Sequence, residues 1–319
     1  MTHIAIDQDI TPTERVLDSL PDAWEASVGI GSTEETAISD LAGVDVALVT
    51  SRVPLSERVI DASDLGLVGK LGTGLDSVDV AAARARDIEV TYTPGMNALS
   101  VAEHTLTLLL ATARRLTEAR GLIETDRWRD EMTLGTRVSG STVGIVGFGN
   151  VGKRVGSLLG GFDVDVLVND PYTAEIDAEL VGGRNVPLGE LLADSDFVCV
   201  TAELTPETRG LIGDPEFERM DQSTILVNTA RGPVVDETAL RSALEHDDIA
   251  GAGLDVHHSE PLGSDSAFLD MDSVVLTPHI ASMTLQSRRE LIDRLVENVT
   301  TLWRGDPLPD RYLAPVATE

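Results

Sequence analysis

The sequence predicts an α/β protein made of two doubly wound parallel-sheet domains with a cleft between them. Strand-like and helix-like segments alternate along all 319 residues, which is typical of parallel sheets with helical crossovers. A glycine-rich turn joins an apolar strand to a helix in the middle of the chain. The length is sufficient for two domains, each with its own core.

The first sheet is expected before the glycine-rich turn. Short apolar or alternating segments predict its strands at 3–6, 44–49, 66–71 and 88–92. Amphipathic segments between them predict helices, for example over 13–20 and 56–62. This part contains no phosphate-binding loop of its own.

A long helix is expected to begin near Ser100. The segment from Ser100 to Glu103 matches a capping box, in which a serine N-cap is followed three residues later by glutamate. The apolar run from Leu106 to Leu110 makes this helix apolar on nearly every side, so we expect it to be buried between domains or subunits.

The glycine-rich turn follows the apolar strand Thr142 to Val146. Gly147 permits a tight turn, Gly149 lets the backbone approach a pyrophosphate, and Gly152 lets the next helix lie close to the strand. The free N–H groups at the start of that helix would bind the phosphates. This part of the chain is therefore predicted to be a Rossmann-like dinucleotide-binding domain.

Asp170 ends the next predicted strand, 165–169, and indicates which dinucleotide binds. A carboxylate at this position accepts hydrogen bonds from the ribose hydroxyls and repels a 2′-phosphate. Neither arginine nor lysine directly follows it. The sequence therefore predicts NAD rather than NADP.

The second sheet is predicted to contain six parallel strands, at 142–146, 165–169, 197–201, 224–228, 251–255 and 274–276. A last helix over 285–304 is expected to return to the first domain. We therefore predict a discontinuous substrate-binding domain of residues 1–99 and 283–319, and an NAD-binding domain of residues 100–282.

Three polar residues follow the last strands of the second sheet, at the edge where a cofactor binds. Arg231 offers a planar fork for a carboxylate. His279 can accept a hydroxyl proton, and Glu260 can fix the tautomer of its ring. Together they predict oxidation of an alcohol next to a carboxylate.

Composition limits the partners and the setting of the protein. The chain has 54 acidic and 24 basic residues, and its formal net charge of −30 argues against nucleic acid and anionic membranes as partners. Only Lys70 and Lys153 are lysines, and the acidic residues are spread along the chain, which indicates a halophilic surface.

The chain contains a single cysteine, Cys199, and no signal peptide or membrane-spanning segment, which predicts a cytoplasmic protein. The histidine and cysteine spacing predicts no metal site.

These segments, together with 94–104 and 72–79, resemble the D-isomer-specific 2-hydroxyacid dehydrogenases over about residues 44–303. The resemblance implies a carboxylate-binding Arg231, the acid–base pair Glu260 and His279, and small 2-hydroxy or 2-oxo acids as substrates. It also implies that the backbone from Gly72 to Gly74 meets the substrate carboxylate, and that the protein is a homodimer. The cofactor-binding residues that it implies are Thr73, Gly147, Gly149, Asn150, Val151, Gly152, Asp170, Ala202, Thr229, Ala230 and Asp255.

Within the family the sequence is most similar to phosphoglycerate dehydrogenases, which implies 3-phosphoglycerate as substrate and a short form without a regulatory domain. Arg52 and Lys70 stand where such enzymes place basic residues near the substrate phosphate. Three positions depart from the family pattern: Thr50, Glu203 and His257. The alternatives are a reductase of hydroxypyruvate, glyoxylate or another 2-oxo acid, and, in a different class, an NAD-sensing protein similar to a corepressor.

Overall fold

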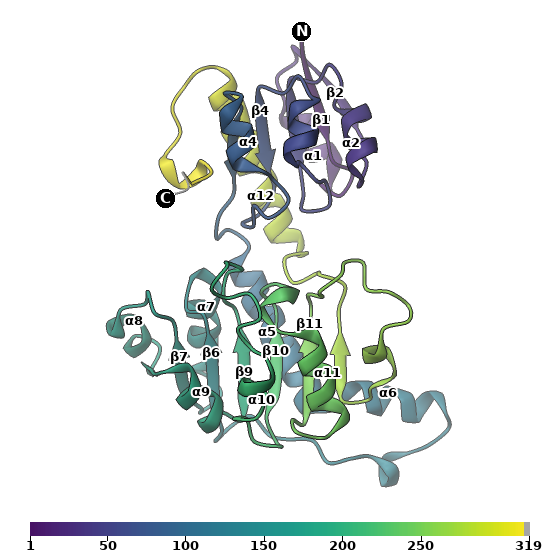
Figure 1. Cartoon of the computed structure of the whole chain (residues 1–319), viewed down its shortest axis with the longest axis vertical. Helices are drawn as coiled ribbons and strands as arrows, with labels where there is room; N and C mark the ends of the chain where they lie inside the picture. The colour runs from purple at the N-terminus through teal and green to yellow at the C-terminus, as the bar shows by residue number, and fades with distance from the viewer. Residues whose placement is uncertain (316–319) are drawn as a thin grey trace. The chain divides into compact units, whose positions relative to one another are not determined.

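The computed structural model describes residues 1–315 and divides the chain into two compact units. One unit contains Met1–Asn97 and the C-terminal part from Met283 onward, and the other contains Ala98–Ser282. In Figure 1 the first unit carries the purple and yellow ends of the colour scale, and the second carries the teal and green middle. Each unit is an α/β structure around one parallel sheet, as the sequence predicts.

The first unit has five parallel strands in the order β2-β1-β3-β4-β5, so the strand order reverses between β1 and β3. Their bounds are β1 Thr2–Ile6, β2 Trp24–Val28, β3 Val46–Val49, β4 Leu67–Lys70 and β5 Glu89–Tyr92. Four of them lie where the sequence predicts strands. The edge strand β2 is absent from the prediction, although its residues Trp-Glu-Ala-Ser-Val alternate between apolar and polar; the strand is short, and four of its five residues are exposed.

Helices cover both faces of this sheet. They are α1 Thr13–Ser19, α2 Glu34–Asp40, α3 Glu57–Asp61, α4 Val80–Ala85 and α12 Leu285–Trp303, with the short 3₁₀ turn η4 Asp310–Tyr312. Alternate strand residues enter two separate cores: Ala47 and Val49 face one, whereas Val46 and Leu48 face the other with α12. The last helix begins at the predicted residue and packs on β4.

The second unit has seven parallel strands in the order β12-β11-β10-β9-β6-β7-β8. Their bounds are β6 Thr142–Val146, β7 Asp165–Asn169, β8 Gly183–Asn185, β9 Phe197–Val200, β10 Ile225–Asn228, β11 Gly251–Leu254 and β12 Val274–Leu276. The six predicted strands are present, but the prediction of six is one too few. The additional strand, β8, has only three residues, none of them apolar, and lies at the sheet edge.

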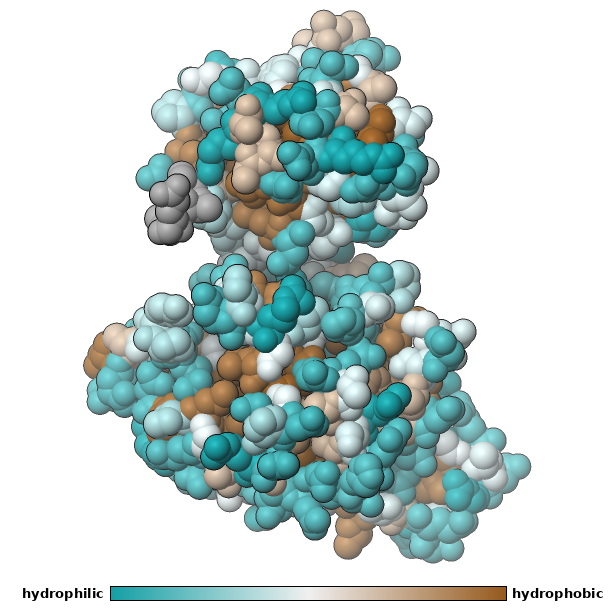
Figure 2. Space-filling view, viewed as in Figure 1, coloured by the Kyte–Doolittle hydropathy of each residue, from teal (hydrophilic) through white to brown (hydrophobic). Residues whose placement is uncertain are grey.

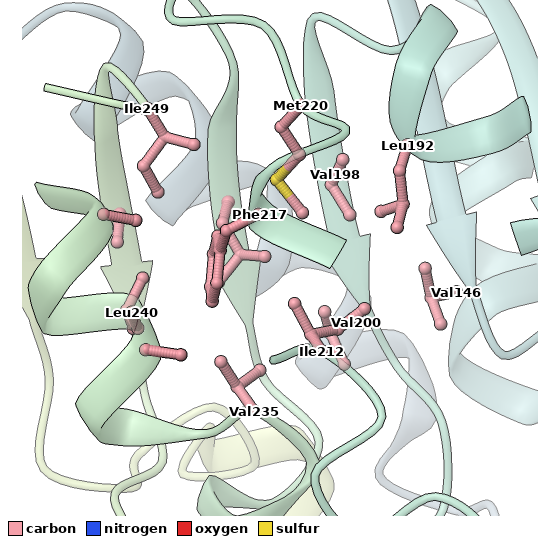
Figure 3. Close-up of a cluster of buried hydrophobic side chains, with 14 of the residues drawn as sticks. Val146, Leu192, Val198, Val200, Ile212, Phe217, Met220, Val235, Leu240 and Ile249 are labelled. Atoms are coloured by element: carbon pink, nitrogen blue, oxygen red, sulfur yellow. The ribbon is translucent and has the colours of Figure 1, made fainter. Parts of the chain in front are cut away.

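The helices of this unit also lie on both faces of its sheet. They are α5 Ala98–Ala113, α6 Leu116–Glu124, α7 Asn150–Leu159, α8 Glu175–Glu179, α9 Leu188–Asp194, α10 Asp214–Phe217 and α11 Glu237–Glu245, with 3₁₀ turns η1 Arg129–Glu131, η2 Gly232–Val234 and η3 Ala267–Asp270. Figure 3 shows the core on one face, where Phe217 and Leu240 pack against strand residues such as Val198 and Val200. The other face is covered by α5 and α7.

The predicted N-cap of α5 is wrong. The helix begins at Ala98, so Ser100 lies in its first turn and Asn97, rather than Ser100, directly precedes it. Asparagine is itself a favoured N-cap residue, and the capping-box pattern alone does not distinguish the two starts.

Hydrophilic residues cover most of the face shown in Figure 2, with apolar patches among them. Within residues 1–315, no helix is long and apolar enough to cross a membrane.

Candidate active site

The turn after β6 requires glycine at Gly147. This residue has φ +85°, and a Cβ atom there would lie 2.5 Å from the backbone nitrogen of Ala202. Thr201 Oγ1 donates a hydrogen bond to the Gly147 carbonyl at 2.6 Å. The turn therefore rests directly on the chain that leaves β9, at the point where the strand order of this sheet reverses.

The start of α7 lies open beyond this turn. A Cβ atom at Gly149 would meet nothing within 4 Å, and both Gly149 and Asn150 are exposed. No side chain caps the helix, and its first turn contains no acidic residue. Gly152, in contrast, is buried, and a Cβ atom there would strike the Gly147 carbonyl. Val151 packs against the core on this face of the sheet.

Asp170 follows β7 and points back to the glycine turn. Its Oδ2 accepts the Phe148 N–H at 2.7 Å and its Oδ1 accepts the Tyr172 N–H at 2.8 Å. Each carboxylate oxygen has a second lone-pair direction, so the group can still accept ribose hydroxyls. The residues around it thus fit an NAD molecule: open helix N–H groups for the pyrophosphate and a carboxylate for the ribose.

Four other predicted cofactor residues, Ala202, Thr229, Ala230 and Asp255, follow strands of the same sheet, whereas Thr73 belongs to the first unit. Thr229, buried, shares a 2.7 Å hydrogen bond with Thr105 of α5. The Ala230 N–H donates to the side-chain oxygen of Asn228 at 3.0 Å.

Arg231 is presented by the loop after β10. The Asn228 side-chain amide donates to the Arg231 carbonyl at 3.1 Å, and its side-chain oxygen accepts the Ala230 N–H. These two hydrogen bonds hold the turn that carries Arg231. The guanidinium Nη1 donates to the Ala230 carbonyl at 2.8 Å. The next residue, Gly232, lies against the backbone of His257, where a side chain would not fit. The loops that carry Arg231 and Glu260 are therefore packed directly against each other.

Glu260 and His279 form a hydrogen-bonded pair. Glu260 Oε2 lies 2.7 Å from His279 Nδ1, and Glu260 Oε1 accepts the His257 N–H at 3.1 Å. Burial alone would raise the pKa of Glu260, but the hydrogen bond and charge of His279, with the His257 N–H, outweigh burial and lower it. Because the glutamate engages Nδ1, the Nε2 nitrogen of His279 is the one that can exchange a proton with a substrate.

The backbone of His279 is held in an unusual conformation, with φ +54°. Its N–H donates to the Asp255 carbonyl at 2.8 Å, while the Asp255 carboxylate accepts the N–H groups of Ile280 and Ala281 at 2.8 and 2.9 Å. Asp255 is only 1% exposed. It therefore clamps both sides of the loop that carries the histidine.

Two further side chains support this clamp. Thr277 Oγ1 donates to Asp255 at 2.6 Å, and His104 Nε2 lies 3.3 Å from the same carboxylate oxygen. Burial would raise the pKa of Asp255, but these hydrogen bonds and the two backbone N–H groups lower it overall.

In the first unit, the predicted substrate residues lie at the end of β4 or in the loops after β3 and β4. The Gly72 N–H donates to Thr93 Oγ1 at 2.8 Å, whereas Thr73 is exposed and Gly74 is half-buried. Thr73 Oγ1 binds Asn97 and accepts the Gly95 N–H, which holds this loop against the end of the unit.

The two predicted phosphate-binding cations are both engaged inside the first unit. Lys70 is 3% exposed, and its Nζ donates to the Leu71 carbonyl at 3.0 Å. Arg52 forms an ion pair with the fully buried Asp7 and donates to the Ile30 carbonyl at 2.5 Å. Thr50, one of the three positions that depart from the family pattern, also contacts Asp7, because its hydroxyl donates a hydrogen bond to the same carboxylate.

The other two departures from the family pattern have local roles. His257 is buried, and its Nε2 lies 3.0 Å from the Thr277 carbonyl, so it links the Glu260 loop to the strand that precedes His279. The Glu203 carbonyl accepts a hydrogen bond from Thr208 in the loop after β9.

Several supporting residues are absent from the sequence prediction, chiefly Asn228, Gly232 and Thr277. An asparagine at a strand end followed by Thr-Ala-Arg-Gly is a signal for a side chain that closes a turn. The roles of Gly232 and Thr277 depend on contacts across the sheet and leave no local pattern. Over the described residues 1–315, no group of three His, Cys, Asp or Glu side chains could hold a metal ion.

The comparison with known proteins assigns the family. Residues 106–281, more than half of the chain, match the family described as "D-isomer specific 2-hydroxyacid dehydrogenase, NAD binding domain". The chain belongs to this family. The second unit therefore contains an NAD-binding domain of the D-isomer specific 2-hydroxyacid dehydrogenases, a family of oxidoreductases.

Two relatives show how far the similarity extends. The chain is 35% identical to the D-3-phosphoglycerate dehydrogenase of Archaeoglobus fulgidus over 91% of its own length, but it spans only 55% of that protein. It is 39% identical to the glyoxylate reductase of Korarchaeum cryptofilum, covering 83% of this chain and 81% of that one. The chain thus spans about half of the first relative and most of the second.

Solved structures of relatives have the same fold over the whole chain. The TT0316 protein of Thermus thermophilus aligns with a TM-score of 0.88 at 29% identity, covering 98% of this chain and 100% of that one. D-Lactate dehydrogenase of Aquifex aeolicus, solved with NAD and lactic acid, aligns with a TM-score of 0.83 at 26% identity, covering 95% and 96%.

Proposed function

We propose that this protein interconverts a D-2-hydroxy acid and the corresponding 2-oxo acid with NAD(H). The observation that carries the proposal is the Glu260–His279 pair, which leaves His279 Nε2 available for a proton. The same unit contains the glycine turn and Asp170, which fit NAD, and Arg231, which suits a carboxylate.

The chemistry divides between the cofactor and the side chains. Bound NAD⁺ supplies an acceptor for the hydride that leaves C2 of the hydroxy acid. His279 Nε2 takes the proton of the C2 hydroxyl as the carbonyl forms, and it returns a proton to the carbonyl oxygen in the reverse direction. Glu260 keeps Nδ1 as the donor side of the ring and stabilises the charged imidazolium. Arg231 holds the substrate carboxylate with its planar fork.

We assign substrate binding to the first unit and cofactor binding to the second. In the loop after β4, the Gly72 N–H is used by Thr93, so the amides proposed to meet the substrate carboxylate are those of Thr73 and Gly74. Lys70 lies beneath this loop, because a Cβ atom at Gly72 would lie 3.5 Å from its Nζ. This geometry supports a role for Lys70 in holding the loop.

The first candidate substrate is 3-phosphoglycerate, from the motifs of the first unit and the similarity to phosphoglycerate dehydrogenases. A glyoxylate or hydroxypyruvate reductase is the second candidate. It is favoured by the coverage of the Korarchaeum cryptofilum glyoxylate reductase, of which the chain spans 81%.

The proposal is tested by steady-state kinetics with purified protein and NADH. The panel contains 3-phosphohydroxypyruvate, hydroxypyruvate, glyoxylate and pyruvate, followed by 3-phosphoglycerate with NAD⁺. His279→Ala should lower kcat by about 10²- to 10⁴-fold, while NADH binding, measured by fluorescence, is retained. Tight NADH binding by the wild type without turnover of any 2-oxo acid would instead support an NAD-sensing protein.

We also propose that the protein is a homodimer that associates through the second unit. Large apolar side chains are exposed on and after α6: Leu116, Ile123, Trp128 and Leu134, the last 94% exposed. Figure 1 shows α6 and the segment after it extending from the edge of this unit. Light scattering after size exclusion should give twice the chain mass of 34.0 kDa, and Trp128→Asp with Leu134→Asp should give the monomer.

The setting proposed is the cytoplasm of a halophile. A net charge of −30 with two lysines suits a surface in concentrated salt, where self-repulsion is screened. Cys199 is buried and free, and burial raises the pKa of its thiol to about 12, so it remains an inert thiol.

A further inference from the structure

The first unit contains an arginine, Arg288, that forms no ion pair with any carboxylate among the described residues 1–315. Arg288, in the first turn of α12, is half-buried, and its Nε is inaccessible to solvent. Among residues 1–315, this Nε has no hydrogen-bond partner. A buried donor without an acceptor costs free energy, so an anionic group that binds there would be stabilised.

The position of Arg288 follows from how α12 crosses the sheet. A Cβ atom at Gly66, before β4, would meet Trp303 near the end of the helix, and one at Gly69 would meet Val299 and Leu295. The helix therefore runs antiparallel to β4, and its start lies at the carboxyl end of that strand, next to the loop from Gly72 to Gly74.

Arg288 also continues the face of α12 that packs on the sheet. The buried stripe of this helix includes Leu291, Ile292, Leu295 and Val299. Position 288 lies three, four, seven and eleven residues before these, so it belongs to the same stripe. Its guanidinium therefore lies at the sheet side of the helix, just beyond the last apolar layer.

The neighbouring cations differ from Arg288 in having partners within the unit, although the Nε of Arg52, like that of Arg288, makes no hydrogen bond. Arg52 is paired with Asp7 and approaches Asp9, and Lys70 is bound to the Leu71 carbonyl. Burial lowers the pKa of Arg288, and the negative charges of Asp9 and Asp7 oppose this effect without either residue forming an ion pair with it. Arg288, Arg52 and Lys70 carry three positive charges against the two negative charges of Asp7 and Asp9. This local excess of positive charge stands in a chain whose net charge is −30.

We propose that Arg288 is a specificity-determining residue that binds a second anionic oxygen group on the substrate, a phosphoryl or carboxylate group beyond the 2-oxo acid unit. This inference rests on the proposed function. The unit that binds the substrate carboxylate through the Thr73 and Gly74 amides then also selects the remainder of the molecule. Arg52 instead holds Asp7 and orders the ends of β1 and β3.

The test compares 2-oxo acids that differ only beyond the reacting carbons. 3-Phosphohydroxypyruvate carries a phosphoryl group, oxaloacetate a carboxylate, and pyruvate and glyoxylate neither. For the better of the two anionic substrates, Arg288→Gln should lower kcat/KM by roughly 10- to 100-fold, mainly through KM. Its kcat/KM for pyruvate and glyoxylate should change by less than about threefold. Arg288→Lys should retain part of the preference because it keeps the charge.

Arg289→Gln is the matched control, because Arg289 is the adjacent exposed arginine of the same helix. It should leave every value within about twofold. Equal loss on all four substrates in Arg288→Gln, with turnover by the wild type, would overturn the role of Arg288 but leave the proposed function in place. Absence of turnover by the wild type on every substrate would remove both. If Arg288→Gln does not fold, the same comparison with Arg288→Lys decides.

Discussion

Gly232 should be essential because it lets two active-site loops touch. A Cβ atom placed there would lie 2.1 Å from both the carbonyl carbon and oxygen of His257, whereas ordinary contacts begin at 3.4 Å. All of the obstructing atoms are backbone, so no rotamer change can relieve the clash. Gly232→Ala must therefore separate the two loops by about 1.3 Å, the difference between these distances.

The separation moves Arg231, next to Gly232, away from the loop that carries Glu260. Where the Glu260 loop yields, the shift also strains its 2.7 Å hydrogen bond to His279. We expect overpacking to lower the free energy of unfolding by about 1–3 kcal/mol. A misplacement of about 1 Å between catalytic groups should lower kcat/KM by about 10²-fold.

The measurements are urea unfolding followed by circular dichroism, and steady-state kinetics with NADH and the best 2-oxo acid. NADH binding should change little, because the glycine turn after β6 is not part of this contact. Gly161→Ala is the matched control, since a Cβ atom there meets nothing within 4 Å and the residue is exposed. A Gly232→Ala protein with the stability and activity of the wild type would refute the reasoning.

Three further predictions concern the cofactor, pH and salt. Asp170→Ala combined with Pro171→Arg should shift the ratio of kcat/KM toward NADPH by at least about tenfold, because a cation replaces the carboxylate that repels a 2′-phosphate; an unchanged ratio would contradict the role of Asp170. The lowered pKa of Asp255 means that its carboxylate stabilises the fold above the ordinary aspartate pKa, near 3.9, and that this contribution is lost as pH falls through the folded value. The difference in Tm between wild type and Asp255→Asn should accordingly be constant from about pH 5 to 8 and shrink below about pH 4, and a difference independent of pH would count against it. Activity and Tm should fall below about 0.5 M KCl as unscreened carboxylates repel one another, and full activity in dilute buffer would exclude the halophilic interpretation.

The sequence by itself determined the class of the fold and the chemistry of its key side chains. Alternating segments predicted both parallel sheets, and the spacing from Gly147 to Asp170 predicted a strand, turn, helix and second strand that the structure contains. These signals are local, because a turn or a helix start depends on residues only a few positions apart. The same local nature explains two of the errors: the short edge strand β8 contains no apolar residue, and both Asn97 and Ser100 are residue types that can cap α5. The strand β2 is different, because its residues do alternate between apolar and polar and the prediction overlooks them.

Only the tertiary structure decided which polar groups are engaged with one another. Arg52 meets Asp7, 45 positions away, because β1 and β3 are neighbours in the sheet. Asp255 clamps the His279 loop because β11 and β12 are adjacent, and Gly232 touches His257 because β10 and β11 are. Arg288 keeps a buried donor without a partner because α12 runs antiparallel to β4. Residue type states what a side chain can bind, whereas strand order and helix direction determine which groups lie within its reach.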